Sequence, residues 1–312
     1  MKTNITMRAP CLATLALSVA LASGAGAQGL SYDILTTGSG TGRGGSPETR
    51  TFMAAHGQFA GGKSRLDITE SMSRGGMMGA GTYMIMNPAK GTTTMVDPAK
   101  REYLELNPSE LAKSTAGLQQ MVSGMVKQEL SGVRVNVEEL GAGETIEGYA
   151  TLKYRITDDY TMKTSIMGRT SETVEHSTTD LWVAPKLDGI MNPLARPASS
   201  AATGPMAELT NELTQAYTKM RSGVMLKSIR TSASVTNGKS NSSTMTMTLS
   251  NVKRASISAS VFEVPSDYAK AASPLDALGA MSDSLNGKSE TKDDPKAQAK
   301  KALGRFLGRP MT

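Results

Sequence analysis

The sequence predicts a β-rich α+β fold, and three patterns support this. Beyond residue 30, most of the chain alternates polar and apolar residues or carries short apolar runs broken by Gly and Pro, as antiparallel strands do. Two turns repeat Pro-Ala-Lys, at 88–90 and 98–100, where Pro sets the φ angle that a tight turn needs. Two other segments repeat apolar residues at helical spacing. We therefore expect an antiparallel sheet with two amphipathic helices.

The predicted strands are short alternating or apolar runs bounded by turn residues. They are Tyr32–Thr36, Thr51–Phe59, Lys63–Thr69, Thr82–Met86, Thr92–Val96, Glu102–Leu106, Val133–Leu140, Thr145–Thr157, Met162–Met167, Glu172–Val183, Val224–Thr231, Ser243–Leu249 and Ile257–Val264. The clearest run is Thr244–Leu249, which places Met245, Met247 and Leu249 on one face and threonines on the other. This alternation predicts a strand with one buried face.

The two predicted helices each carry one apolar stripe. The first begins with Asn107 as a cap and Pro108 in the first turn, and ends at Gly132. Its stripe consists of Leu111, Leu118, Met121, Val122, Met125, Val126 and Leu130. The second helix follows Pro205 and ends at Gly223, with a stripe of Met206, Leu209, Leu213, Tyr217 and Met220. Both stripes should lie against the sheet, because an exposed apolar stripe is unfavourable.

The first 27 residues have the pattern of a cleavable secretory signal peptide. Lys2 and Arg8 precede an uncharged apolar run from Leu12 to Ala22, and small residues then offer a cleavage site after Ala27. The apolar run is about half of the roughly 20 residues that a membrane-spanning helix needs. We therefore expect a periplasmic or secreted protein that is cleaved after Ala27.

The remaining chain divides into one domain at 28–268 and a tail at 269–312. After Tyr268 the composition shifts to Ala, Ser, Asp, Lys and Gly without strand periodicity, which predicts a disordered tail. Its last part, Lys296 to Arg309, is basic, and apolar residues fall on one helical face there. This segment is either a solvated tail or a weak amphipathic helix that meets a membrane surface.

Composition argues against several classes of function. The single cysteine, Cys11, lies in the signal segment, so the mature chain has no disulfide or thiol ligand. A formal net charge of +6 is too small to indicate nucleic-acid binding. The chain has 21 Met against 4 Phe and 1 Trp. Methionine fills irregular cores, but it also suits surfaces that meet varied apolar ligands.

No motif predicts catalysis or cofactor binding. Residues 57–64 match the P-loop pattern, but strand-like alternation follows instead of a helix, so Gly61-Gly62 is better interpreted as a hairpin turn. His56 and His176 are the only histidines, so a zinc site would need both of them together with carboxylate ligands brought close by chance. A serine triad would have to recruit one of them without a Gly-x-Ser-x-Gly elbow. We therefore predict no catalytic residue, no metal site, no cofactor and no enzyme.

Three segments together resemble a bacterial exported domain-of-unknown-function family whose fold is similar to the lipoprotein carriers LolA and LolB. They are Gly143–Tyr154, Asp180–Pro185 and Val261–Tyr268, and Lys63–Asp67 and Arg101–Leu106 fit the same pattern. The resemblance covers about 31–268. It implies a LolA-like half-barrel, an incomplete antiparallel β-barrel wrapped around the two amphipathic helices. It supplies no catalytic residue.

The leading functional expectation is a periplasmic, non-catalytic module that binds or handles a lipid or another apolar small molecule. Its ligand would lie between a Gly-rich loop, the first helix and methionine-bearing strands. The candidate ligand-binding residues are Met77, Met78, Met84, Met86, Met121, Met125, Val126, Met245 and Met247. The first alternative is an envelope interaction protein with a packed interior and no ligand, and the second is a hydrolase. The oligomeric state does not follow from the sequence.

Overall fold

The computed structural model describes residues 27–40, 49–72, 78–107, 126–166, 168–187 and 206–271. The strands in these ranges are β1 (Ala27–Gly40), β2 (Arg50–Ala60), β3 (Lys63–Ser71), β4 (Tyr83–Asn87), β5 (Thr92–Asp97), β6 (Glu102–Leu106), β7 (Val126–Ala142), β8 (Leu152–Ile166), β9 (Arg169–Ala184), β10 (Val224–Thr236), β11 (Lys239–Ile257) and β12 (Ala269–Lys270). The described helices are α2 (Ala207–Thr218) and the 3-10 helices η1 (Pro185–Leu187) and η2 (Ala259–Phe262).

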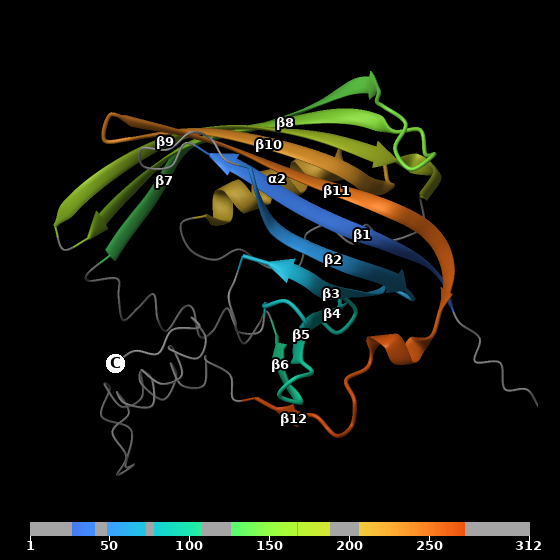
Figure 1. Cartoon of the computed structure of the whole chain (residues 1–312). Coiled ribbons are helices and arrows are strands. Elements are labelled where there is room, and N and C mark those ends of the chain that lie inside the picture. Colours follow the sequence, from blue (N-terminus) through green and yellow to red (C-terminus); the bar gives the residue numbers. More distant parts are fainter. Residues whose placement is uncertain are drawn as a thin grey trace, which may run out of the picture.

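All twelve strands belong to one sheet in the order β12-β6-β5-β4-β3-β2-β1-β11-β10-β9-β8-β7. Strands β1 to β6 form one antiparallel meander and β7 to β11 form a second. The two meanders join where β11 pairs antiparallel with β1, so the first strand lies in the middle of the sheet. Figure 1 shows the second meander above and the first turning away below it. Short β12 adds to β6 in parallel at one edge.

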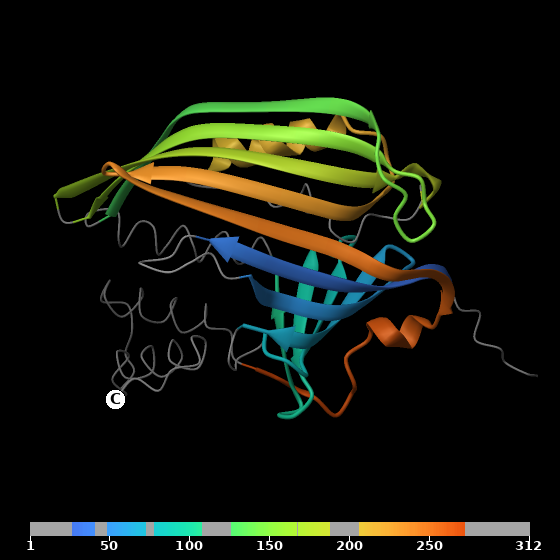
Figure 2. The ribbon, with the colours of Figure 1, turned by 45° about the horizontal axis from the view of Figure 1, so that its top comes forward.

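The predicted half-barrel wrapped around two helices is wrong. The sheet is open, with β7 at one edge and β12 at the other, and α2 is the one α-helix among the described residues. Helix α2 contains Leu209, Leu213 and Tyr217 of the second predicted stripe, and it lies against one face of the second meander (Figure 2). The two edge strands do not pair with each other, so the described strands do not close into a barrel.

The first predicted helix is corrected at its end. Residues 108–125 lie outside the described residues, but Val126 and Leu130 belong to β7, opposite Ile166 and Met162 of β8. A ladder with β8 therefore outweighs the helical spacing of these two residues. The predicted strand Ile257–Val264 is also wrong over most of its length. Its residues after Ile257 form η2, where the Ser258 side chain accepts a hydrogen bond from the Ser260 amide.

Several turns follow the predicted chemistry. Gly61 and Gly62 join β2 to β3 in a two-residue hairpin, and both have positive φ angles of 56° and 75°. Only glycine adopts such angles without strain, which confirms the hairpin interpretation of the P-loop pattern. Asp97 accepts hydrogen bonds from the amides of Ala99 and Lys100 in the second Pro-Ala-Lys turn. Asx bonding of this kind fixes the start of the turn.

The two faces of the sheet bury separate apolar clusters. We call the face that contacts α2 the inner face; there Leu213 and Met220 pack on a cluster that includes Tyr154, Ile156 and Leu181. A second inner cluster surrounds β1, with Leu30, Tyr32, Ile34, Phe59, Leu66 and Leu249 among its buried members. The outer face is covered near β3 to β5 by η2 and the chain after it. No described helix is long and apolar enough to cross a membrane.

Candidate functional site

The structure brings four of the predicted ligand-binding methionines to the inner face. Residues directly opposite each other on neighbouring strands project to the same side of a sheet. Met247 lies in one row with Ser228, Leu181 and Tyr154, and Met245 lies in the next row. Met84 and Met86 lie on the same face, as the strand register shows when it is followed from β4 across β3 and β2 to β1. The alternation of β4 and β11 therefore gathers side chains from distant parts of the chain.

The other predicted residues are not brought to this surface. Met77, Met121 and Met125 lie outside the described residues, and so does the side chain of Val126. Met78 lies in the turn before β4 and is 39% exposed. The basic segment from Lys296 to Arg309 also lies outside the described ranges, so its contact with a membrane surface stays a prediction.

The inner-face methionines differ in burial. Met84, Met86 and Met247 are partly buried against the cluster around β1, and Met53 joins them. Met247 also contacts the cluster beneath α2, so it links the two inner clusters. Met245 is 46% exposed and lies opposite Gly38. Apolar surface therefore continues from a packed region to an accessible one.

Phe52 extends the exposed apolar surface beside Met245. Phe52 is the extra residue of a β-bulge between β1 and β2, and its side chain is 40% exposed. Its ring lies over Gly38, because a Cβ built on this glycine would stand 2.2 Å from the ring. Glycine is therefore required here for the close approach of the ring. Two large apolar side chains, Phe52 and Met245, thus flank Gly38 at the accessible part of the inner face.

Tyr32 places one unpaired polar atom inside the inner face. The side chain is fully buried, and its ring lies over Gly57, where a Cβ would stand 2.1 Å away. Its hydroxyl has no hydrogen-bond partner among the described residues. Burial raises the pKa of this phenol, so the hydroxyl stays protonated and can donate. A buried hydroxyl without a partner is unfavourable by about 1–3 kcal/mol.

The polarity of the inner face changes along β8 to β10. Arg230 donates from Nη1 and Nη2 to the two carboxylate oxygens of Asp158, at 3.1 and 3.0 Å. Nη2 also donates to Ser177 Oγ at 2.8 Å. Asp158 and Ser177 are fully buried, whereas the Arg230 side chain is 38% exposed. Because Met245 lies opposite Arg230, the exposed apolar surface borders a charged group.

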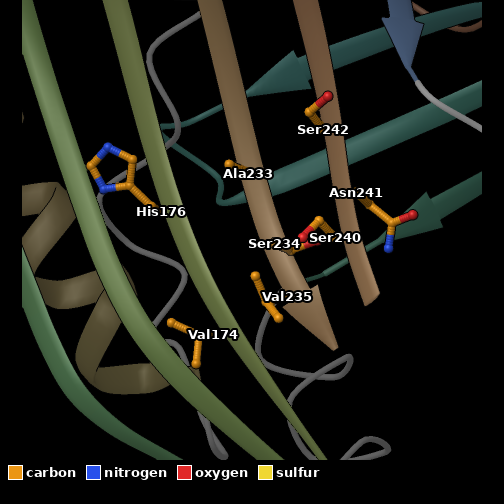
Figure 3. A pocket seen from close by; sticks show the side chains of 8 residues that line it. All are labelled: Val174, His176, Ala233, Ser234, Val235, Ser240, Asn241 and Ser242. Atoms are coloured by element: carbon orange, nitrogen blue, oxygen red, sulfur yellow. The ribbon is translucent and has the colours of Figure 1, made fainter. Parts of the chain in front are cut away.

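A depression of about 410 Å³ lies elsewhere, near the start of β9 and the turn between β10 and β11. It is lined by Val174, His176, Ala233, Ser234, Val235, Ser240, Asn241 and Ser242 (Figure 3). None of the predicted methionines within the described ranges lines it. The described residues also include no group of three or more His, Asp or Glu side chains that could hold a metal ion.

The model of a family described as a domain of unknown function, DUF4412, matches residues 51–268. The chain belongs to this family. The match runs from β2 through η2, so the DUF4412 segment excludes β1, which nevertheless occupies the centre of the sheet. No curated protein matches the chain.

One solved structure was also found, the crystal structure of Ail, the attachment invasion locus protein of Yersinia pestis. It is 8% identical to this DUF4412 protein, and the similarity covers 73% of this chain and 97% of that one. The TM-score of 0.15 is too low to indicate a shared fold.

Sequence reasoning missed three residues that shape this surface, Tyr32, Phe52 and Arg230. Tyr32 was expected to be an ordinary strand residue, and no local signal distinguishes it from another buried tyrosine. Phe52 becomes prominent only through a bulge between β1 and β2, which alternation does not reveal. Arg230 meets Asp158 across an intervening strand, and 72 positions separate the two residues in the chain. Register between distant strands is the missing information in each case.

Proposed function

We propose that this DUF4412 protein is exported and binds an apolar ligand with one polar group on the inner face of its sheet. The carrying observation is the Tyr32 hydroxyl, a buried donor without a described partner among methionine-flanked apolar side chains. Binding sites for small amphipathic molecules combine a mostly apolar lining with a few polar anchors. A ligand oxygen that accepts from Tyr32 would relieve its unpaired state.

The composition of the surface favours a flexible chain as the apolar part of the ligand. Met53, Met84, Met86 and Met247 are all partly buried, so their unbranched side chains can move to admit a guest. Burying an acyl chain contributes about 0.8 kcal/mol per methylene, which allows a chain of moderate length to offset association costs.

Export is proposed on the sequence of the first 27 residues. The expected cleavage site after Ala27 falls at the first residue of β1, and Leu30 is already fully buried. Removal of the preceding residues would therefore leave the central strand intact from Gln28 onward.

The test begins with organic extraction of the purified protein, mass spectrometry of the extract, and titration of a fluorescent fatty acid into delipidated material. We expect co-purifying lipid and saturable binding. Tyr32→Phe should weaken binding about 3- to 10-fold, the equivalent of one neutral hydrogen bond. The matched control is Tyr154→Phe, since the Tyr154 hydroxyl already donates to Glu139 on the same face.

The same experiment separates the proposal from its main rival. If no lipid is extracted, no binding saturates and Tyr32→Phe behaves like Tyr154→Phe in the titration, the interior is simply packed. An envelope interaction protein would then be the better interpretation. Met245→Ser adds a second arm, because loss of an accessible apolar side chain should weaken binding only if the ligand reaches the exposed part of the inner face.

A further inference from the structure

The outer face carries a chain of hydrogen bonds that joins a serine, a histidine and an aspartate from two strands. His56 on β2 donates from Nδ1 to Asp33 Oδ1 on β1 at 2.8 Å. Ser31 Oγ lies 3.3 Å from His56 Nε2. Ser31 and Asp33 are two positions apart in β1, which places both side chains on one face, and Asp33 lies directly opposite His56. The order of contacts is that of a nucleophile, a base and an orienting acid.

A third strand fixes the aspartate. Asn251 on β11 donates from Nδ2 to Asp33 Oδ2 at 2.7 Å. Its φ angle of 53° belongs to a bulge where β11 carries an extra residue opposite β1. Bulges re-aim side chains, and here the amide is directed at the carboxylate. Both Asp33 oxygens are thus engaged, so the carboxylate is held in one orientation.

The protonation states suit this relay. The hydrogen bond from His56, followed by that from Asn251, lowers the pKa of Asp33. In the neutral imidazole tautomer that donates from Nδ1 to Asp33, Nε2 is the acceptor for the Ser31 hydroxyl. The His56 and Asp33 side chains are each 43% exposed, so an external molecule can approach. The relay is preformed and accessible from solvent.

We propose that Ser31, His56 and Asp33 hydrolyse short acyl esters on the outer face. Ser31 Oγ attacks the ester carbonyl carbon while His56 Nε2 takes the hydroxyl proton. The bond from the carbonyl carbon to the alcohol oxygen breaks, and the alcohol leaves with the proton from His56. Water then attacks the acyl-serine carbonyl carbon and gives a proton to His56 Nε2. The bond from that carbon to Ser31 Oγ breaks, Oγ takes the proton back from His56, and a carboxylic acid is released. Asp33 and Asn251 are positioning residues.

The surroundings of Ser31 indicate how the substrate would be held. Gln58 on β2 and Lys253 on β11 are its direct cross-strand neighbours. Their amide and ammonium groups are donors for the negative carbonyl oxygen of the intermediate. Leu35, four residues along the same face, is 45% exposed and offers an apolar contact. A short acyl group fits this open surface, since a long chain would have no enclosing wall.

This site is independent of the proposed ligand surface, because it lies on the opposite face of the sheet. The first test uses p-nitrophenyl acetate hydrolysis and labelling by a fluorophosphonate probe, with the modified peptide identified by mass spectrometry. We expect label on Ser31, and a loss of hydrolysis of at least tenfold in Ser31→Ala and His56→Ala. His176→Ala is the matched control. His176 also pairs with an aspartate, Asp159, but its other cross-strand neighbour is Ala233.

A second test does not depend on turnover. In a Cys11→Ala background, Ser31→Cys introduces the only thiol, and Ser39→Cys places the same group farther along the same face of β1. If His56 accepts the proton from position 31, the thiol there should react with iodoacetamide about tenfold faster than the one at position 39 near pH 6. Adding His56→Ala should abolish the difference. Equal thiol reactivity, or hydrolysis and labelling that persist in Ser31→Ala, would overturn the proposal.

Discussion

The guanidinium of Arg230 on β10 reaches across β9 to form a two-pronged ion pair with Asp158 on β8. The intervening strand contributes Ser177, whose hydroxyl accepts a further hydrogen bond from Arg230 and contacts Ser232 Oγ at 2.9 Å. Asp158 is fully buried, and Arg230 supplies its counter-charge. The ion pair therefore ties together three strands of the second meander.

Asp158→Asn should destabilise the protein by about 3 kcal/mol, because it leaves a partly buried guanidinium without its counter-charge. Urea unfolding at neutral pH measures the change. Asp267→Asn is the control: Asp267 lies 3.5 Å from Arg101 and both side chains are mostly exposed. That variant should change stability by less than about 1 kcal/mol. Equal effects would mean that the Asp158 pair is no stronger than a surface one.

Tyr32→Phe should raise the free energy of unfolding of delipidated protein by about 1 kcal/mol, because it removes a buried hydroxyl that has no described partner. Tyr154→Phe should act in the opposite direction. The Tyr154 hydroxyl donates to Glu139 Oε2 at 3.2 Å and accepts from the Arg221 amide at 3.4 Å. Urea titration of both variants checks the signs. Destabilisation by Tyr32→Phe would show that its hydroxyl is paired.

Asp180 should make the free energy of unfolding depend on pH in the acidic range. Hydrogen bonds from Arg155 lower the pKa of Asp180 against the effect of burial, and Lys153 lowers it further. The folded pKa thus lies below the ordinary value of 3.8, so the stabilisation is complete above that value and is lost as pH falls through the folded pKa. Asp180→Asn should lower stability at pH 7, and the difference between the two proteins should be smaller at about pH 2. Urea unfolding at both pH values tests this.

Gly57→Ala should destabilise the protein by about 1–3 kcal/mol, because the new Cβ would stand 2.1 Å from the Tyr32 ring. Gly40→Ala is the control, as its nearest neighbour would be 3.3 Å away at the end of β1. Thermal melts compare the two. Combining Gly57→Ala with Tyr32→Leu should recover part of the loss if the clash is with this ring. A cost that persists unchanged would place the clash elsewhere.

Processing should produce a mature N-terminus at Gln28. Intact-mass measurement of protein recovered from outside the cytoplasm tests the prediction. Ala27→Arg should block cleavage, because the small residue at the cleavage site is required. Exported protein with residues 1–27 still attached would contradict it.

Local chemistry made parts of the fold predictable. The alternation of Thr244–Leu249 placed Met245, Met247 and Leu249 on one face correctly, because side chains alternate along a strand. It did not give their burial, since Leu249 is fully buried and Met245 is 46% exposed. Gly61 and Gly62 predicted their turn correctly, because positive φ angles favour glycine. The second helix was recognisable from Leu209 and Leu213, which repeat at helical spacing. Each of these signals lies within a few neighbouring residues.

The sequence by itself thus determined the β-rich class, a helix between Pro205 and Gly223, and the turns at Gly61-Gly62 and at Asp97–Lys100, and it predicts the secretory leader. The tertiary structure decided that the sheet stays open, that Val126 and Leu130 join a strand, and that β1 lies between the two meanders. It also decided which side chains meet: Ser31 with His56, and Arg230 with Asp158. The physical reason is that periodicity assigns a face to each residue, whereas the pairing of distant strands depends on the register and burial of the whole sheet.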